Sequence, residues 1–241
     1  MNPNQPTQQK SSVEEIRARF DREVERFSNL ETGQSATIDA PLVLELIAAS
    51  AASATPQARS LLDVGCGAGN YTLKLLERLP LERVTLIDLS SVMLDRARQR
   101  IGERFPVAVE TLQVDIRQAE LPAQSFDVIT AAAVLHHLRS DQEWQAVFAK
   151  LHACLRPGGS LWISDLVDHV PQVQGLMWER YGRYLEELKG AEYREHVLAY
   201  VEQEDTPRPL FFQLELLKSV GFRAIEVLHK NGMFAAFGAI R

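Results

Sequence analysis

The stretch Leu61-Leu-Asp-Val-Gly-Cys-Gly-Ala-Gly-Asn70 decides the fold of this chain, together with the apolar run Val84–Asp88 that follows it. An apolar strand here enters a turn with Gly65, Gly67 and Gly69, and a helix is expected just after it. Glycine allows positive φ and a close approach of the backbone to a ligand. An acidic residue about 20 positions on, at the end of a second strand, suits the diol of a ribose. The pattern therefore predicts a nucleoside-containing cofactor.

Two features of the same stretch distinguish between the possible cofactors. The spacing is G-x-G-x-G, and Asn70 stands where a dinucleotide-binding fingerprint would place its third glycine. Asp63 lies inside the first strand, two residues before Gly65. A carboxylate so close repels an anionic pyrophosphate, whereas a ligand with an amine and a sulfonium tolerates it. Asp63 therefore favours S-adenosylmethionine over a nicotinamide dinucleotide.

Further motifs in the expected order give the chain a resemblance to the class I S-adenosylmethionine-dependent methyltransferases. The matching segments span roughly residues 60–165 and are Leu61–Asn70, Asp88, Asp115-Ile116, Phe126–Ile129 and Leu155–Gly159. The resemblance implies a Rossmann-like α/β fold: a doubly wound, seven-stranded sheet with an antiparallel last strand and a helical lid. It also implies S-adenosyl-L-methionine as cofactor and S-adenosylhomocysteine as product.

The resemblance assigns cofactor-binding roles to individual residues. Asp88 is expected to accept hydrogen bonds from both ribose hydroxyls, because a carboxylate offers two acceptor oxygens to two vicinal donors. Met93 is expected to pack on the adenine, Asp115 to meet its amino group and Ile116 to stack on the ring. The alternatives are a helix cap for Asp88, plain core for Met93 and a loop aspartate at 115. The expected set is Asp63, Gly65, Cys66, Gly67, Gly69, Asp88, Leu89, Met93, Asp115, Ile116 and Ala132.

His136 and His137 are the candidate catalytic residues. A histidine titrates near neutral pH and could take a proton from a hydroxyl, thiol or acidic carbon acceptor. Since a sulfonium is already a good leaving group, in-line placement can also suffice, and the histidines would then only cap or pack. The segment Thr130–Val134 lacks the Asn/Asp-Pro-Pro-Tyr/Phe motif of enzymes that methylate amino groups of bases and glutamine. No metal ligand set is predicted, because Asp165 and Asp168 alone are weak evidence for a cation site.

The composition of the chain limits which classes of protein it can belong to. The chain has 241 residues, a formal net charge of −6 and a hydrophobic fraction of 46%, which is typical of a globular protein. The acidic balance disfavours nucleic-acid binding, and no apolar run reaches the ~18 residues that span a membrane. The polar N-terminus does not read as a signal peptide, and Cys66 and Cys154 form no disulfide framework. We expect a cytoplasmic monomer or homodimer that acts on a small-molecule substrate.

Strands and helices alternate after residue 59, which predicts βαβ units around a parallel sheet. Pro157-Gly158-Gly159 is expected to break a helix and lead into the fifth strand, and Asn231-Gly232 to form the turn of a final β-hairpin. The expected strands are 60–64, 83–88, 107–113, 126–131, 159–164, 222–229 and 233–240, and the expected core helices are 41–52, 70–78, 91–102, 141–155 and 210–219. The expected organisation is a disordered tail (1–11), N-terminal helices that form part of a cap (12–58), the cofactor-binding core (59–166), an inserted helical lid (167–210) and a closing helix with the hairpin (211–241).

Three other functions compete with methyl transfer to a small molecule. Carboxy-S-adenosylmethionine synthases, which act on the cofactor in tRNA modification, share the general layout, and Arg194 lies in the region where they hold the added carboxylate. The chain could also be a non-catalytic S-adenosylmethionine-binding protein, or it could methylate an RNA base. The lid arginines Arg180, Arg183 and Arg194 could instead bind an anionic substrate or lie on a solvated face.

Overall fold

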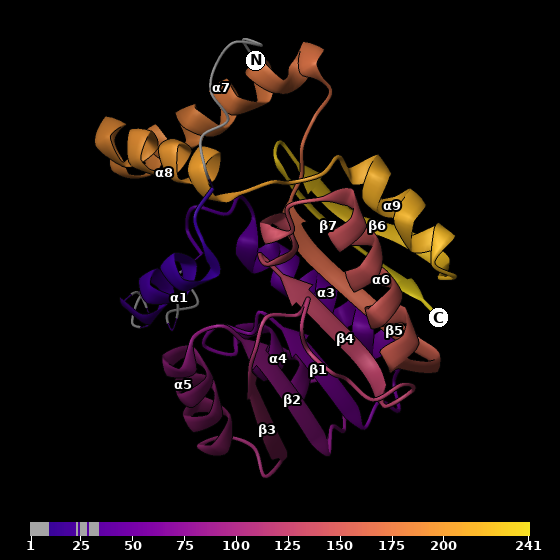
Figure 1. The fold of residues 1–241 in the computed structure, drawn as a ribbon. Helices are drawn as coiled ribbons and strands as arrows, with labels where there is room; N and C mark the ends of the chain where they lie inside the picture. Colours follow the sequence, from indigo (N-terminus) through magenta and orange to yellow (C-terminus); the bar gives the residue numbers. More distant parts are fainter. Residues whose placement is uncertain (1–9, 23, 25–27, 29–33) are drawn as a thin grey trace.

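The computed structural model describes residues 10–22, 24, 28 and 34–241, and its centre is a seven-stranded sheet (Figure 1). The strand order is β3-β2-β1-β4-β5-β7-β6. β1 to β5 run parallel, whereas β7 is antiparallel to both β5 and β6. The strands are β1 (Ser60–Val64), β2 (Arg83–Asp88), β3 (Ala108–Gln113), β4 (Phe126–Ala132), β5 (Leu155–Leu166), β6 (Arg223–Asn231) and β7 (Phe234–Ile240). The predicted fold class is confirmed, including the antiparallel last strand.

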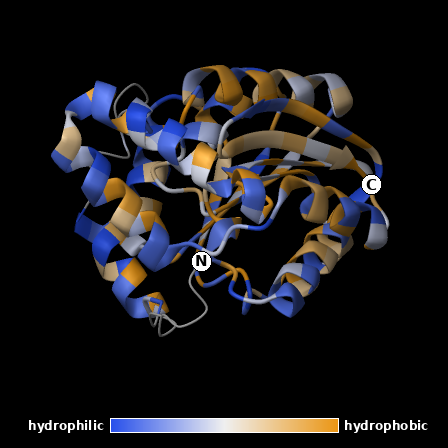
Figure 2. Cartoon of the chain, turned by 90° about the horizontal axis from the view of Figure 1, so that it is seen from above, coloured by the Kyte–Doolittle hydropathy of each residue, from blue (hydrophilic) through white to orange (hydrophobic). Residues whose placement is uncertain are grey.

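Helices cover both faces of the sheet. Leu61 and Leu62 are fully buried on opposite faces of β1, since successive side chains of a strand alternate. α3 (Ala40–Ala54), α4 (Asn70–Leu76) and α5 (Ser91–Gly102) pack on the face of Leu61. α6 (Asp141–Cys154) and α9 (Leu210–Ser219) pack on the face of Leu62. Figure 2 shows the hydrophobic residues concentrated in the strands between these two layers.

The expected helices and strands of the core agree with the structure within a few residues at their ends, with one exception. The Pro157-Gly158-Gly159 segment was expected to precede the fifth strand, but β5 begins at Leu155, directly after α6. Leu155 already pairs with Phe126, and a register shift follows before Val128 pairs with Ser160. The segment is therefore a bulge within β5, because the backbone resumes pairing beyond it.

Local sequence signals explain several helix starts. In α1 (Val13–Arg22), the Ser12 backbone N–H donates to Glu15 (2.8 Å) and the Glu15 N–H donates to the Ser12 hydroxyl (3.3 Å). This reciprocal pair is a capping box. Ile16 is the apolar side chain that α1 buries. Among the described residues, every helix is too short or too polar to cross a lipid bilayer.

The inserted segment is a pair of helices, α7 (Pro171–Lys189) and α8 (Ala191–Glu204), which lies with α1 beyond the carboxyl ends of the parallel strands (Figure 1). Tyr181 and Tyr184 of α7 donate hydrogen bonds to the Ala36 and Ser35 carbonyls at 2.9 and 2.8 Å. The segment leaves and re-enters the core at one place, where Asp168 forms a β-bridge with Pro209. These contacts position α7 and α8 over the sheet edge where ligands bind in such folds.

Candidate active site

A cleft of about 860 Å³ lies at the carboxyl edge of β1, β2 and β4, around the glycine turn that follows β1. We call it the glycine-loop cleft. The topology explains its position, because the sheet order reverses at the pair β1 and β4, and ligands bind at such switch points. The predicted residues that line it are Gly65, Gly67, Asp88, Leu89, Met93, Asp115, Ile116, Ala132 and His137.

Gly65 and Gly67 keep the floor of this cleft open. Their φ angles are 65° and 50°, in the left-handed region that side chains rarely adopt. A Cβ atom on Gly65 would lie 2.6 Å from Val134, whereas the space above Gly67 is empty out to 4 Å. The Gly65 N–H is held by the Ile87 carbonyl of β2 at 2.8 Å. The turn is therefore rigid and presents bare backbone to a ligand.

Asp88 lies at the end of β2 and is tied to the glycine turn. Its Oδ2 accepts from the Gly67 N–H and its Oδ1 from the Ser90 N–H, both at 2.9 Å. The helix cap of α5 is Ser90, whose hydroxyl accepts from the Met93 N–H, so Asp88 is not the cap. Burial raises the pKa of Asp88, because a desolvated carboxylate is less stable in its charged form. Each oxygen keeps a second lone pair for a ligand hydroxyl.

Asp63 is buried under the glycine turn and does not line the cleft. Its two oxygens accept from the hydroxyls of Thr72 (2.6 Å) and Thr130 (2.9 Å). Burial raises the pKa of Asp63 to about 6, although the two hydroxyls oppose this shift. The carboxylate can act on a ligand amine through its field or through a water, and no direct path from it to the cleft is open. Cys66 and Gly69 also do not line the cleft.

Asp115 lines the cleft but is held by a neighbour that the sequence did not single out. The Arg117 guanidinium binds both carboxylate oxygens of Asp115, with the shortest distance 2.6 Å, and also reaches Glu143 at 3.0 Å. Burial alone would raise the pKa of Asp115, but the hydrogen bonds from Arg117 hold it below its ordinary value. Met93 and Ile116 are almost fully buried beside this carboxylate, so a flat apolar ring could pack there.

A second, larger space of about 1450 Å³ lies between the sheet edge, α1 and the α7–α8 pair. We call it the histidine cavity. It shares Phe20, Ala132, Ala133 and His137 with the glycine-loop cleft, so the two spaces adjoin. Its other walls include aromatic and basic side chains from distant parts of the chain, namely Arg19, Arg22, Tyr71, Tyr181, Tyr193, His196 and Tyr200.

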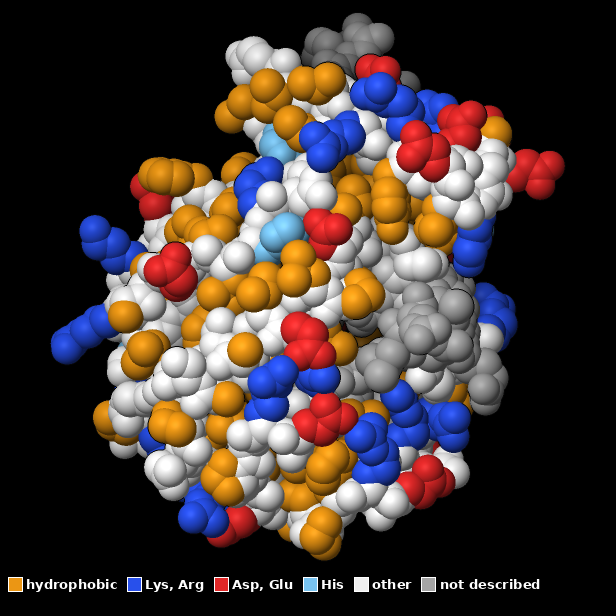
Figure 3. Space-filling view, turned by 180° about the vertical axis from the view of Figure 1, so that it is seen from behind, with side chains coloured by type: hydrophobic (Ala, Val, Ile, Leu, Met, Phe, Trp, Pro, Cys, Tyr) orange, Lys and Arg blue, Asp and Glu red, His pale blue; other side chains and the backbone are white. Residues whose placement is uncertain are grey.

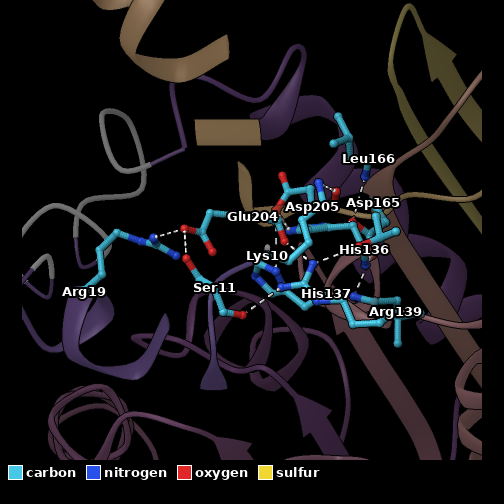
Figure 4. A network of polar contacts seen from close by, with 12 residues as sticks. Lys10, Ser11, Arg19, His136, His137, Arg139, Asp165, Leu166, Glu204 and Asp205 are labelled. Atoms are coloured by element: carbon cyan, nitrogen blue, oxygen red, sulfur yellow. Dashed lines mark hydrogen bonds and ion pairs between the residues drawn. The ribbon is translucent and has the colours of Figure 1, made fainter. Parts of the chain in front are cut away.

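His136 and His137 lie in a short 3-10 helix, η1 (Leu135–His137), and Figure 4 shows their polar surroundings. Both line the histidine cavity, and His137 also lines the glycine-loop cleft. The Nδ1 atom of His136 forms a short hydrogen bond with Asp165 at the end of β5. Asp165 also accepts from the backbone N–H groups of Leu135 (2.8 Å) and His136 (3.2 Å), so its carboxylate is fixed. Burial alone would lower the pKa of His136, but the facing Asp205 and Asp165 raise it to about 9.

The pKa of His137 is shifted in the opposite direction from that of its neighbour. Burial, and then the charge of His136, hold the pKa of His137 well below its ordinary value. Its Nδ1 atom is buried without a hydrogen-bond partner and lies 3.5 Å from Oδ1 of Asp205, which also has none. Burial raises the pKa of Asp205 to about 6. The end of α8 is held here because the Thr206 N–H donates to the His136 carbonyl at 2.7 Å.

The sequence singles out the two histidines as catalytic candidates but does not connect the carboxylates around them to these histidines, and Asp165 enters only with Asp168, as weak evidence for a cation site. Asp165 could have been identified, because an acid at the end of a buried strand is the same signal that pointed to Asp88. Asp205 carries no such signal, since it follows α8 and reaches η1 only through folding. The lid arginines do not reach the histidine cavity: Arg194 pairs with Glu186 on the exposed surface at 2.8 Å.

Comparisons with known proteins agree with this geometry. Residues 61–159 match the model of a methyltransferase domain family. The chain contains a class I methyltransferase domain. S-adenosylmethionine is the cofactor of these methyltransferases, and the glycine turn and Asp88 of the cleft fit such a nucleoside.

Relatives support the same assignment over part of their length. An uncharacterised methyltransferase of Mycobacterium tuberculosis is 32% identical over 118 residues, 49% of this chain and 55% of the relative. A trans-aconitate 2-methyltransferase of Azoarcus is 36% identical over 159 residues, 66% of this chain and 59% of the relative. The chain thus spans little more than half the length of these relatives. Human N-acetylserotonin methyltransferase, crystallised with S-adenosylmethionine, shares the fold (TM-score 0.63, 18% identity, 96% of this chain and 60% of that one).

Proposed function

We propose that this protein transfers a methyl group from S-adenosylmethionine to a small-molecule acceptor held in the histidine cavity. The observation that carries the proposal is the junction of the two spaces at Ala132, Ala133 and His137. A cofactor in the glycine-loop cleft would present its reactive end toward this junction. The acceptor atom, whether oxygen, nitrogen, sulfur or acidic carbon, is not specified by the cleft.

The residues of the cleft suit each part of the cofactor. Asp88 would accept from the ribose hydroxyls, and the bare backbone at Gly65 and Gly67 would face the methionine part. Met93 and Ile116 would enclose the adenine, whose amino group would share Asp115 with Arg117. The bound cofactor supplies a methyl group on a sulfonium, a centre that needs only an in-line nucleophile. Asp63 would contribute negative charge below the turn, where the amine of the cofactor would lie.

The surroundings of the histidine cavity favour a small acceptor. The cavity is covered by α7, α8 and α1, whose contacts leave room for a compact molecule rather than a polymer. On the face of the molecule in Figure 3, Lys and Arg side chains are interleaved with Asp and Glu instead of gathering into a basic surface. A nucleic-acid substrate would need such a surface to bind its phosphates.

The carboxy-S-adenosylmethionine synthase reading is not favoured by the structure. It requires a cationic side chain that reaches the methyl end of the cofactor, and Arg194 was the candidate. Arg194 instead forms an exposed pair with Glu186 at 2.8 Å and lines neither space. Mass spectrometry of the cofactor that co-purifies with the full chain distinguishes the two, because a carboxylated species would contradict methyl transfer.

The proposal is tested with the purified full chain in two steps. Isothermal titration calorimetry should show one S-adenosylmethionine bound per chain. Incubation with a library of small hydroxy, carboxy, amino and thiol compounds should then release S-adenosylhomocysteine with at least one of them. Absence of cofactor binding would contradict the proposal, whereas binding without turnover on any compound would favour a cofactor-binding protein without catalytic activity.

A further inference from the structure

Three side-chain atoms converge where the two histidines of η1 meet the end of α8. Oδ1 of Asp205 lies 3.6 Å from Nε2 of His136 and 3.5 Å from Nδ1 of His137. All three atoms lie within 4.8 Å of one another. Figure 4 shows the side chains directed toward a common centre from two segments that are far apart in the sequence.

Two of these atoms are buried and make no hydrogen bond. Nδ1 of His137 and Oδ1 of Asp205 have no hydrogen-bond partner, and Asp205 is only 6% exposed. A buried polar atom without a partner costs about 1–3 kcal/mol, so its persistence needs an explanation. The nearest cations do not donate to this oxygen: Nε2 of His136 stays 3.6 Å away, Lys10 donates to the backbone carbonyl of Asp205 (2.9 Å), and Arg139 donates to that of Glu204.

Asp165 prepares His136 to act as a ligand. The hydrogen bond between Asp165 and Nδ1 of His136 leaves Nε2 to face Asp205. The backbone N–H groups of Leu135 and Leu166 hold the Asp165 carboxylate in turn, at 2.8 and 2.7 Å. Metal-binding histidines in proteins are oriented by such carboxylates, which fix the tautomer and make the imidazole more basic.

We propose that His136, His137 and Asp205 bind a divalent transition-metal ion in the wall of the histidine cavity. Ligand atoms about 2.0–2.2 Å from such an ion lie roughly 3.0–3.5 Å apart. The two distances to Asp205, 3.6 and 3.5 Å, are already close to this range, and the two imidazole nitrogens, which lie within 4.8 Å of each other, would approach by a side-chain rotation when the ion binds. Two imidazoles and one carboxylate on one side of an ion leave its other positions open. No sequence motif predicts this site, because Asp205 lies in a segment outside the matched domain.

All three ligand residues line the histidine cavity, so the open positions of the ion would be accessible from that cavity. The kind of acceptor that can bind there follows from the chemistry of the ion. This step rests on the function proposed above. An acceptor with a hydroxyl or carboxyl oxygen would occupy an open position of the ion, next to His137, which borders both spaces. The ion would orient that oxygen and favour its anionic form, so the acceptor is an oxygen donor that binds metal ions. A thioether or an unactivated carbon would gain nothing from the ion.

Cobalt is the probe for the site, because its visible absorption reports the ligands. The full chain is stripped with a chelator and titrated with Co²⁺, with the absorption spectrum recorded at each step. We expect one equivalent to bind with a visible band, and Asp205→Asn to weaken Co²⁺ binding at least tenfold. Asp165→Asn is expected to weaken it by about 10–100-fold, as for other carboxylates behind a histidine ligand. The matched control is Asp39→Asn, which removes the carboxylate paired with His229 at 2.9 Å and should leave cobalt binding unchanged.

The same samples separate this inference from the proposed function. S-adenosylmethionine binding is measured by calorimetry on the stripped protein, with and without Co²⁺, and for each variant. Cofactor binding that persists in Asp205→Asn while cobalt binding is lost supports the metal site and shows that the variant is folded. No cobalt band in the wild-type protein, or equal cobalt affinity in Asp205→Asn, overturns the metal site and leaves the cofactor result to decide the proposed function.

Discussion

The glycine-loop cleft and the histidine cavity adjoin, yet they are built in different ways. The cleft is lined mainly by the glycine turn and by the residues that follow β2, β3 and β4, and hydrogen bonds such as that between Gly67 and Asp88, 21 positions apart, connect these segments. The cavity is made of side chains from opposite ends of the chain, and Lys10 reaches Asp205 over 195 positions. The matched methyltransferase domain, residues 61–159, contains η1 and the lining of the cleft except Phe20 and Gln34, but it contains none of α1, α7 or α8.

This contrast separates the general part of the reaction from its specific part. A binding site built around the glycine turn of one domain can be shared by a whole family. A cavity made of side chains on inserted helices changes with each substitution, so it can select the acceptor. Perturbing the two regions should therefore affect different measurements.

The substitution of Asp88 is expected to cause the largest change among these variants, and the change should appear in cofactor binding to the glycine-loop cleft. Asp88→Ala removes the acceptor for both ribose hydroxyls, and hydrogen bonds to a charged group contribute about 1.5–3 kcal/mol each. The dissociation constant of S-adenosylmethionine should rise at least tenfold in calorimetry. Asp95→Ala, an exposed carboxylate of α5, is the control. Equal affinities of Asp88→Ala and the wild type would remove Asp88 from the site.

A pair of glycine substitutions tests the difference in backbone. Gly65→Ala should lower the free energy of unfolding by about 1–3 kcal/mol, because φ is 65° and the new Cβ would meet Val134 at 2.6 Å. Gly175→Ala in α7 meets no atom within 4 Å and should be neutral or stabilising by up to about 1 kcal/mol. Urea denaturation measures both. Similar decreases in the free energy of unfolding of the two variants would show that the backbone of the glycine turn is no more restricted than that of α7.

The pH dependence of the free energy of unfolding should reveal the raised pKa of Asp63. Between its unfolded pKa near 3.9 and its folded pKa of about 6, the native state holds a proton that the unfolded state has lost. The contribution of Asp63 to the free energy of unfolding therefore falls as the pH rises from about 4 to 6, and stays low above 6. Asp63→Asn should be more stable than the wild type at pH 7.5 and lose this advantage near pH 4.

Cofactor binding by the same variant is the complementary measurement. Asp63→Asn should bind S-adenosylmethionine more weakly at pH 7.5, because the negative charge beneath the turn is gone. A variant that is less stable than the wild type at pH 7.5 would contradict the raised pKa. A variant with unchanged cofactor affinity would restrict Asp63 to a structural role.

Arg194→Ala should have the smallest effect. The pair between Arg194 and Glu186 is exposed, with 38% and 46% of the two side chains accessible, and such pairs contribute between zero and about 1 kcal/mol. Thermal unfolding and S-adenosylmethionine binding should both stay close to wild type. A large loss of cofactor binding would place Arg194 near the methyl group and reopen the carboxylated-cofactor alternative.

The cleft could be predicted from the sequence because its determinants are local. Glycine at 65 and 67 and an acid at the end of β2 imply a backbone geometry wherever they occur in this order. The Asn231-Gly232 turn likewise fixes the last hairpin without reference to the rest of the chain.

The cavity could not be predicted in the same way, because its residues meet only through tertiary packing. Asp205 follows an exposed helix and has no neighbour in sequence with which it forms a motif. Arg117 stands two residues after Asp115, yet no spacing rule shows that its guanidinium would engage that carboxylate. The bulge at Pro157–Gly159 was also misplaced, because proline and glycine signal a break without saying whether a strand resumes pairing.

The β-bridge between Asp168 and Pro209 has a consequence for how such proteins diversify. Because the chain departs from the sheet and returns to it at one point, the forty residues between these two positions form a loop whose length is not constrained by the sheet. A gene could exchange or extend this loop without disturbing the register of any strand. For the same reason, residues 169–208 could be replaced as one segment to change which acceptor is bound, while the methyl-donor site stays unchanged.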